Sequence, residues 1–202
     1  MAVAPIRIHS VAEAYLLLMV TPCAACGKGP LEAASHEAVD LEGTRGLKML
    51  ARCKACGGEQ TFVFDLSDVD VADAGSLPHI NLSDRPSQAI DLAQWLMLFE
   101  GILRAADRAT DREEARRLGY EAALCLEEAL KFYPPGDAEW PDESSFFQES
   151  TLARYRQHRH IFARTRLIEL RGRLPSLGRM ERTLTSDADR PVRRSWWAFW
   201  RR

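Results

Sequence analysis

Long apolar runs are absent from this chain of 202 residues, and so are most of the patterns that mark an enzyme. A bilayer-spanning helix needs roughly 18 consecutive apolar residues, and no run approaches that length. The sequence has no glycine-rich phosphate loop, no nucleophile elbow and no His-Glu-x-x-His motif. These absences exclude a membrane-spanning helix and lead us to expect a protein that is not an enzyme.

Each part of the chain is poor in charge of one sign. Residues 1–150 carry 13 Lys and Arg against 25 Asp and Glu, whereas residues 151–202 carry 14 Arg against 4 acids. The hydrophobic fraction of 46% is that of an ordinary globular protein. We therefore expect a folded, acidic body followed by a basic C-terminal quarter, and the two could neutralise each other within one chain.

Cysteine is scarce, but its spacing is informative. Four of the five cysteines form two Cys-x-x-Cys pairs, Cys23 with Cys26 and Cys53 with Cys56, and a glycine follows each pair. A glycine there permits the positive φ that folds the backbone over two sulfur atoms. Two such turns supply four thiolates in a tetrahedron, which suits one Zn²⁺. Four cysteines close the coordination shell, so we expect this zinc to be structural and predict no catalytic residue.

Other uses of the two cysteine pairs are less favoured. Two disulfides would need an oxidising compartment, and the N-terminus is a poor secretion signal because Pro22 occupies a position where cleavage needs small residues. We expect a cytoplasmic protein. Iron in a rubredoxin-type site is a second alternative, because it uses similar cysteine turns. A thioredoxin-like dithiol is a third, but it would need only one of the two pairs. His36 lies between the pairs, and we interpret it as a strand residue rather than a ligand.

Residues 21–66 resemble the zinc-ribbon family through the four cysteines, the two glycines and the strand-like segment after Cys56. The resemblance implies a small three-stranded antiparallel sheet with the metal at one end. Zinc ribbons share a fold and a metal rather than one activity, and they include nucleic-acid binders, protein-interaction modules and inserts within enzymes. The expected strands are Glu32–Val39, Leu47–Arg52 and Gln60–Leu66.

The rest of the chain has helical periodicity. We predict helices over Ser10–Val20, Pro86–Arg108, Thr110–Tyr133, Ser144–Gln157 and His160–Leu174. Ser10 with Glu13, and Thr110 with Glu113, have capping-box spacing.

The expected fold class is α+β, with a small three-stranded antiparallel zinc ribbon packed with or tethered to a bundle of three to four helices. We divide the chain into an N-terminal helix (1–20), a zinc ribbon (21–66), an acidic linker (67–85), a helical bundle (86–174) and a flexible basic, Trp-rich tail (175–202).

Several polar residues in the helical part have a structural interpretation. Residues 115–134, with Leu118-Gly119-Tyr120, resemble one helix of a tetratricopeptide repeat, which implies close helix packing. Cys125 lies on the apolar stripe of this helix and is expected to be buried and inert. The adjacent Glu127 and Glu128 are expected to face solvent, and His158 and His160 to lie in an interhelical turn.

Nucleic-acid binding is the alternative function. Arg159, Arg166 and Arg173 recur at seven-residue steps, so one continuous helix would align them on a face that could bind RNA or DNA. The ribbon is a poorer candidate because the five cations of residues 21–60 are balanced by five acids and the zinc–thiolate group adds −2.

The C-terminal tail is suited to docking because Trp and Arg are enriched at binding hot spots. The docking residues that we predict are Arg193, Arg194, Trp196, Trp197, Phe199, Trp200, Arg201 and Arg202. Their partner could be the protein's own body, a sister subunit or another protein, and a membrane surface is a further alternative. No small-molecule substrate is evident. The leading hypothesis is a zinc-binding adaptor or assembly subunit.

Overall fold

The computed structural model describes residues 4–69 and 80–175. The described residues divide into two compact units. One is built from those up to Ser83 together with Ser87–Ala89, and the other from Asp84–Pro86 and those from Ile90 to Pro175. Each unit is described by itself. The predicted docking residues of the tail lie outside the described residues, as does most of the predicted acidic linker.

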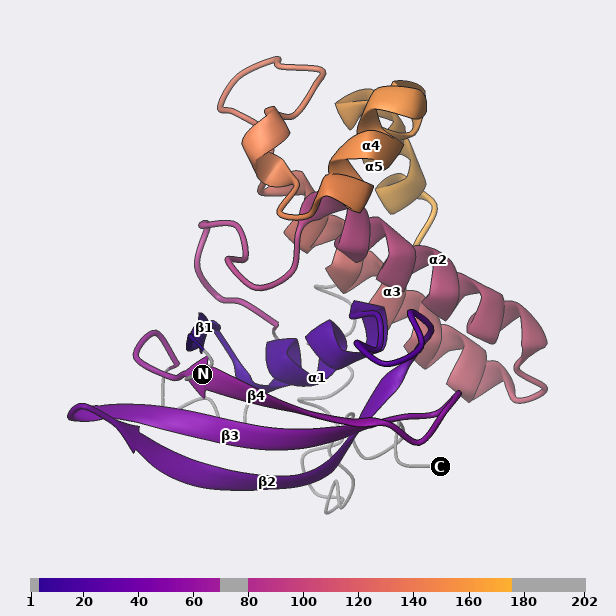
Figure 1. The fold of residues 1–202 in the computed structure, drawn as a ribbon. Helices are drawn as coiled ribbons and strands as arrows, with labels where there is room; N and C mark the ends of the chain where they lie inside the picture. Colours follow the sequence, from indigo (N-terminus) through magenta and orange to yellow (C-terminus); the bar gives the residue numbers. More distant parts are fainter. Residues whose placement is uncertain (1–3, 70–79, 176–202) are drawn as a thin grey trace, which may run out of the picture. The chain divides into compact units, whose positions relative to one another are not determined.

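The first unit contains a four-stranded mixed sheet with the strand order β1-β4-β3-β2 (Figure 1). The strands are β1 (Ile6–Arg7), β2 (Leu31–Leu41), β3 (Thr44–Cys53) and β4 (Glu59–Asp65). Strands β2, β3 and β4 form an antiparallel meander, and β1 pairs with β4 in parallel. The fold class α+β is confirmed, but the three-stranded antiparallel sheet is corrected to four strands with one parallel pair.

The missed strand is too short to have a pattern. Strand β1 has two residues, and alternation of apolar and polar side chains needs about four to be recognised. The meander strands were expected at the right places, but β2 and β3 extend further toward their shared turn. At that turn Gly43 has φ +89° and its N–H donates to Asp40 Oδ1 at 2.8 Å.

Helix α1 (Val11–Val20) belongs to the first unit and contacts β2. Ser10 caps the helix by accepting the Glu13 N–H at 3.2 Å, as the capping-box spacing predicts. Leu18 of the helix and Met49 and Phe64 of the sheet are among its largest fully buried side chains. Removing each such side chain from water contributes roughly 1.5–3 kcal/mol.

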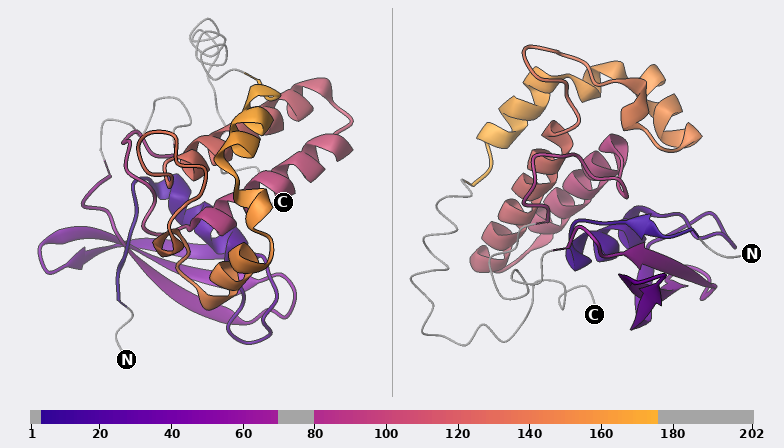
Figure 2. Two further views of the ribbon diagram at one scale, coloured as in Figure 1. Left: turned by 90° about the horizontal axis from the view of Figure 1, so that it is seen from above. Right: turned by 90° about the vertical axis from the view of Figure 1, so that its left-hand side faces the viewer.

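The second unit is helical (Figure 2). Its helices are α2 (Leu92–Arg108), α3 (Arg112–Leu130), α4 (Glu149–Gln157) and α5 (Arg164–Gly172), with short 3₁₀ turns η2 (Glu143–Ser145) and η3 (Arg159–Phe162). Helices α2 and α3 run antiparallel as a hairpin, and α4 contacts α2 while α5 contacts α3. The two C-terminal helices are shorter than predicted because 3₁₀ turns replace their first residues.

The predicted helix starts are corrected by the capping side chains. Helix α2 begins after Asp91 rather than at Pro86, because Asp91 and Gln94 form a capping box. Helix α3 is capped by Asp111, which accepts the N–H groups of Glu113 and Glu114, and not by Thr110. In the predicted linker, Ile80 is only 4% exposed, which differs from a connector lying over the surface.

Asp91 connects three parts of the second unit. Its carboxylate is fully buried; Oδ1 accepts the Gln94 N–H at 2.9 Å, and Oδ2 accepts the Phe147 N–H at 3.0 Å and the Thr151 hydroxyl at 2.6 Å. A buried carboxylate is stable only when such donors replace its water. Asp91 therefore joins the start of α2 to the start of α4.

We predict that Asp91→Ala lowers the free energy of unfolding by about 3 kcal/mol, because it removes the acceptor of three donors, the N–H groups of Gln94 and Phe147 and the Thr151 hydroxyl. Asp111→Ala is the matched control, since it removes an exposed helix cap that costs about 1 kcal/mol. Denaturant unfolding followed by circular dichroism measures both. Equal losses for the two variants would contradict the role assigned to Asp91.

Candidate functional site

The four predicted cysteines lie in two turns that have the same hydrogen-bond pattern. In the turn between α1 and β2, Gly27 N–H donates to Cys23 O at 2.8 Å. In the turn between β3 and β4, Gly57 N–H donates to Cys53 O at 2.9 Å. Gly27 and Gly57 have φ of +67° and +74°, a conformation that side chains disfavour. The glycines therefore shape the two turns as the sequence predicts.

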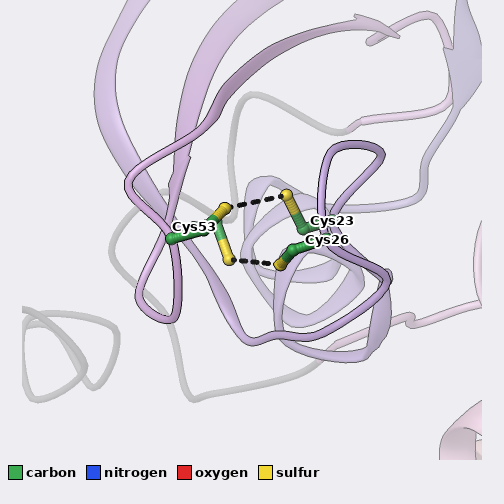
Figure 3. A group of neighbouring side chains, drawn as sticks. Cys23, Cys26 and Cys53 are labelled. Carbon is green, nitrogen blue, oxygen red and sulfur yellow. Dashed lines mark hydrogen bonds between the residues drawn. The ribbon is translucent and has the colours of Figure 1, made fainter.

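The two turns bring the four sulfur atoms together. All four Sγ atoms lie within 4.8 Å of one another. Across the turns, the Sγ–Sγ distance is 3.7 Å for Cys23 and Cys56 and 3.8 Å for Cys26 and Cys53 (Figure 3). No disulfide joins any of the five cysteines. This arrangement can hold one metal ion.

Backbone N–H groups point at the sulfurs. Ala55 N–H lies 3.4 Å from Cys53 Sγ, and Gly58 N–H lies 3.4 Å from Cys56 Sγ. Hydrogen bonds from the N–H groups of Ala25 and Cys26 lower the pKa of Cys23 to about 7.

The neighbouring thiols act on Cys23 and Cys56 in opposite directions, because they lower the pKa of Cys23 and raise the pKa of Cys56. The Gly58 N–H acts to lower the pKa of Cys56, but hydrogen bonds with the other three thiols and burial outweigh it and raise that pKa to about 12. Four thiolates can share this space only if a cation compensates their charge. The donor set therefore fits a soft divalent metal.

The close approach of the two turns depends on Gly58. A Cβ atom at this position would lie 3.2 Å from Cys56 Sγ and 3.3 Å from the Ala25 Cβ of the other turn. Those distances are shorter than ordinary van der Waals contacts, so glycine leaves the room that the sulfurs need. The sequence analysis did not single out Gly58, and its position directly after Gly57 was the available signal.

The sulfur cluster lies at one end of the antiparallel meander. Leu31, the first residue of β2, pairs with Cys53, the last residue of β3. Cys23 and Cys53 are buried, whereas Cys56 is exposed. His36 lies well along β2, where its Nδ1 is 3.3 Å from the Tyr15 hydroxyl, so it is a strand residue as expected. In the part of the chain that the structure describes, no second group of His, Cys, Asp or Glu side chains is close enough to hold a metal.

Several basic residues of the sheet and of the turn after β3 are paired with acids, whereas Arg45 donates to the Val69 carbonyl at 3.0 Å. Lys48 Nζ lies 2.8 Å from Glu37 and Arg52 Nη2 lies 2.6 Å from Glu59. Lys54 pairs with Glu32. The pairing with Lys48 holds the pKa of Glu37 below its usual value. These pairs match the balanced charge of the ribbon sequence.

The predicted arginine face does not lie on one helix. Helix α4 ends at Gln157 and α5 begins at Arg164, so Arg159 lies in the 3₁₀ turn between them. Its guanidinium stacks 4.5 Å from the centre of the Trp140 ring. Arg166 is exposed on α5, and Arg173 follows that helix. The predicted alignment of the three arginines along one continuous helix is therefore wrong, because the helix is interrupted at His158.

Other arginines of this region pair with acids of the same unit. These pairs are Arg154 with Glu100, Arg156 with Glu143, and Arg171 with Glu127. They show in part the neutralisation of the acidic body by the basic quarter that the charge distribution favoured.

Helix α3 holds both confirmed and corrected expectations. Cys125 is 1% exposed, and burial raises the pKa of its thiol, as expected for an inert cysteine. Glu127 is half exposed, but Glu128 is 4% exposed and lies 2.8 Å from Lys131 Nζ. The expectation that both glutamates face solvent is therefore wrong for Glu128. His158 and His160 lie in the interhelical turn, as predicted.

Two buried polar groups were missed by the sequence analysis. Glu13 is fully buried; its Oε2 accepts the His9 N–H at 2.6 Å and lies 3.5 Å from His9 Nδ1. On α3, Glu121 is 7% exposed, and neither carboxylate oxygen has a hydrogen-bond partner within the described residues. Burial raises the pKa of Glu121 from 4.5 to about 7, and Arg117, at 3.8 Å, offsets only part of this shift.

We predict that Glu121 makes the free energy of unfolding fall as the pH rises from 4.5 to 7. In this range the unfolded chain releases the proton while the folded chain retains it, and the loss reaches roughly 3 kcal/mol at pH 8. Glu121→Gln removes this slope and stabilises the protein at pH 8. Glu127→Gln, at a half-exposed position on the same helix, is the control and keeps the slope. Parallel pH profiles for Glu121→Gln and the parent protein in denaturant unfolding would contradict this prediction.

The comparisons with known proteins identify no relative. No family model, no curated protein and no solved structure matches the chain. No described helix is both long and apolar enough to cross a bilayer.

Proposed function

We propose that this protein is a non-enzymatic adaptor or assembly subunit whose first unit is held together by one structural Zn²⁺ on Cys23, Cys26, Cys53 and Cys56. The observation that carries the proposal is the group of four sulfur atoms within 4.8 Å of one another, built from two glycine-shaped turns. Four thiolates in this arrangement favour zinc, which takes tetrahedral sulfur ligands without a redox change.

A structural role follows from the closed ligand set. Catalytic zinc keeps one coordination position for water or substrate, whereas four cysteines occupy all positions. Zinc binding is worth roughly 10–16 kcal/mol in small finger peptides. A unit of fewer than about 80 residues buries a modest core, so this energy is decisive for its folding. The metal then acts on the sheet, by fixing β2 and β3 to each other at Leu31 and Cys53.

The adaptor role is supported by the distribution of residue types that bind partners along the chain. The cations of the sheet form ion pairs with its acids, and Arg159 is stacked on Trp140, which leaves less basic surface for phosphate than the sequence suggests. The tail, with four Arg, three Trp and one Phe after Val192, carries the residue types that anchor protein interfaces. Binding to nucleic acid or to a membrane surface remains a prediction of the sequence analysis.

The proposal is tested by metal analysis of protein purified without added metal. We expect one zinc per chain, and a fall in the melting temperature of more than 10 °C after treatment with a strong chelator. Cys53→Ser should lose the metal and the same stability. Cys125→Ala is the control, because it removes a thiol outside the cluster and should retain one zinc per chain. Metal-free protein with an unchanged melting temperature contradicts the proposal, as does stoichiometric iron.

A further inference from the structure

Strand β2 forms an open edge of the sheet. It is the last strand in the order β1-β4-β3-β2, and no described strand pairs with its other side. With 11 residues it is the longest strand in the structure. An edge of this length offers a row of backbone N–H and C=O groups to an added strand.

The hydrogen bonds of β3 show which residues of β2 face this edge. Cys53 N–H donates to Gly58 O, and Arg45 O accepts from Leu66 N–H, so these alternate residues of β3 bond toward β4. Lys54 N–H donates to Pro30 O, so the residues between them bond toward β2. Because bonding alternates along an antiparallel pair, the β2 residues opposite Met49, Leu47 and Arg45 direct their backbone groups outward. These residues are His36, Ala38 and Asp40.

The outer edge of β2 lacks Pro and the basic side chains of Lys and Arg, two of the features that natural edge strands use against pairing, and a β-bulge shifts its register between Ala33 and Ser35. Residues 34–38 are exposed. Three alanines, Ala33, Ala34 and Ala38, leave space beside the strand for the large side chains of a partner. The edge is therefore open both in its backbone and in its side chains.

The charges of β2 select the partner. Glu32, Glu37 and Asp40 lie on the strand and Glu42 in the turn after it, and no Lys or Arg lies between Leu31 and Gly43. Glu32 and Glu37 already form ion pairs with Lys54 and Lys48, so Asp40 and Glu42 are the acids that favour a basic partner. A second copy of β2 would bring acids against acids, which destabilises strand pairing. A basic strand with aromatic side chains complements both the charge and the open alanine positions.

We propose that β2 is the docking edge for the chain's own basic, aromatic segment, residues 192–200, from the same chain or a sister subunit. This segment contains two Arg, three Trp, one Phe and no acid, and aromatic residues favour strands. Residues 176–191 can span at most roughly 55 Å, which exceeds the roughly 30 Å diameter of a folded unit of this size. The proposal rests on the proposed function, because the metal cluster holds the start of β2 in place.

Amide hydrogen exchange by NMR on the full chain tests this docking. With the segment docked, the amides of His36, Ala38 and Asp40 exchange at least tenfold more slowly than in a variant that ends at Arg190. A synthetic peptide of residues 191–202, added to that variant, restores the protection. The amides of β3 and β4 are the internal reference, since the sheet already protects them in both proteins.

A pair of variants at one position separates docking from folding. Ala38→Pro removes an outward N–H that the sheet does not use, so the sheet should persist while peptide binding weakens at least tenfold. Ala38→Ser keeps the N–H and should bind as the parent does. Zinc content is measured in every variant. Loss of zinc marks a failure of the proposed function, whereas full zinc with unprotected β2 amides overturns the docking proposal alone.

Other occupants of β2 give distinct results. If protection survives removal of residues 191–202 and increases with protein concentration, β2 pairs with a second copy and the proposal is wrong. If the β2 amides exchange fast in the full chain and the tail binds lipid vesicles or RNA instead, the tail has a different partner and the proposal is equally overturned.

Discussion

The first unit depends on the mutual repulsion of four sulfur atoms and on what compensates it. Two turns hold the Sγ atoms within 4.8 Å, and N–H groups from the same turns point at Cys53 Sγ and Cys56 Sγ. Hydrogen bonds from the N–H groups of Ala25 and Cys26 lower the pKa of Cys23, whereas hydrogen bonds with the other thiols and burial raise the pKa of Cys56. We propose that a dication compensates the thiolate charge, at the end of the sheet where Leu31 of β2 pairs with Cys53 of β3.

From this fixed end the remaining structure of the first unit follows. The antiparallel meander extends away from the cluster to the turn at Gly43, and α1 packs against the sheet through Leu18 and its neighbours. Exposed ion pairs on the sheet contribute little stability, but they neutralise the cations of the sheet. Of the acids on β2 and in the turn after it, these pairs use Glu32 and Glu37 and leave Asp40 and Glu42 without an ion pair among the described residues.

The sequence was most informative where the chemistry is local. Cysteine spacing with a following glycine identified the cluster, and alternation located the three meander strands within a few residues. Helix starts were less predictable, because Thr110 and Asp111 are both capping residues and only the surroundings select Asp111. Contacts between residues distant in sequence could not be predicted. Nothing in the sequence near Asp91 indicates that its carboxylate accepts hydrogen bonds from Phe147 and Thr151. The burial of Glu121 was equally invisible, since a glutamate on a helix is usually solvated.

The central claim concerns the ion between the four cysteines, and X-ray absorption spectroscopy at the zinc edge of protein purified without added metal tests it most directly. The account predicts zinc with four sulfur ligands at about 2.3 Å and no nitrogen or oxygen in the first coordination shell. Mixed sulfur and nitrogen or oxygen ligation would show an incomplete cysteine set with a position open to solvent. That result would contradict the closed structural site from which the rest of the account is built.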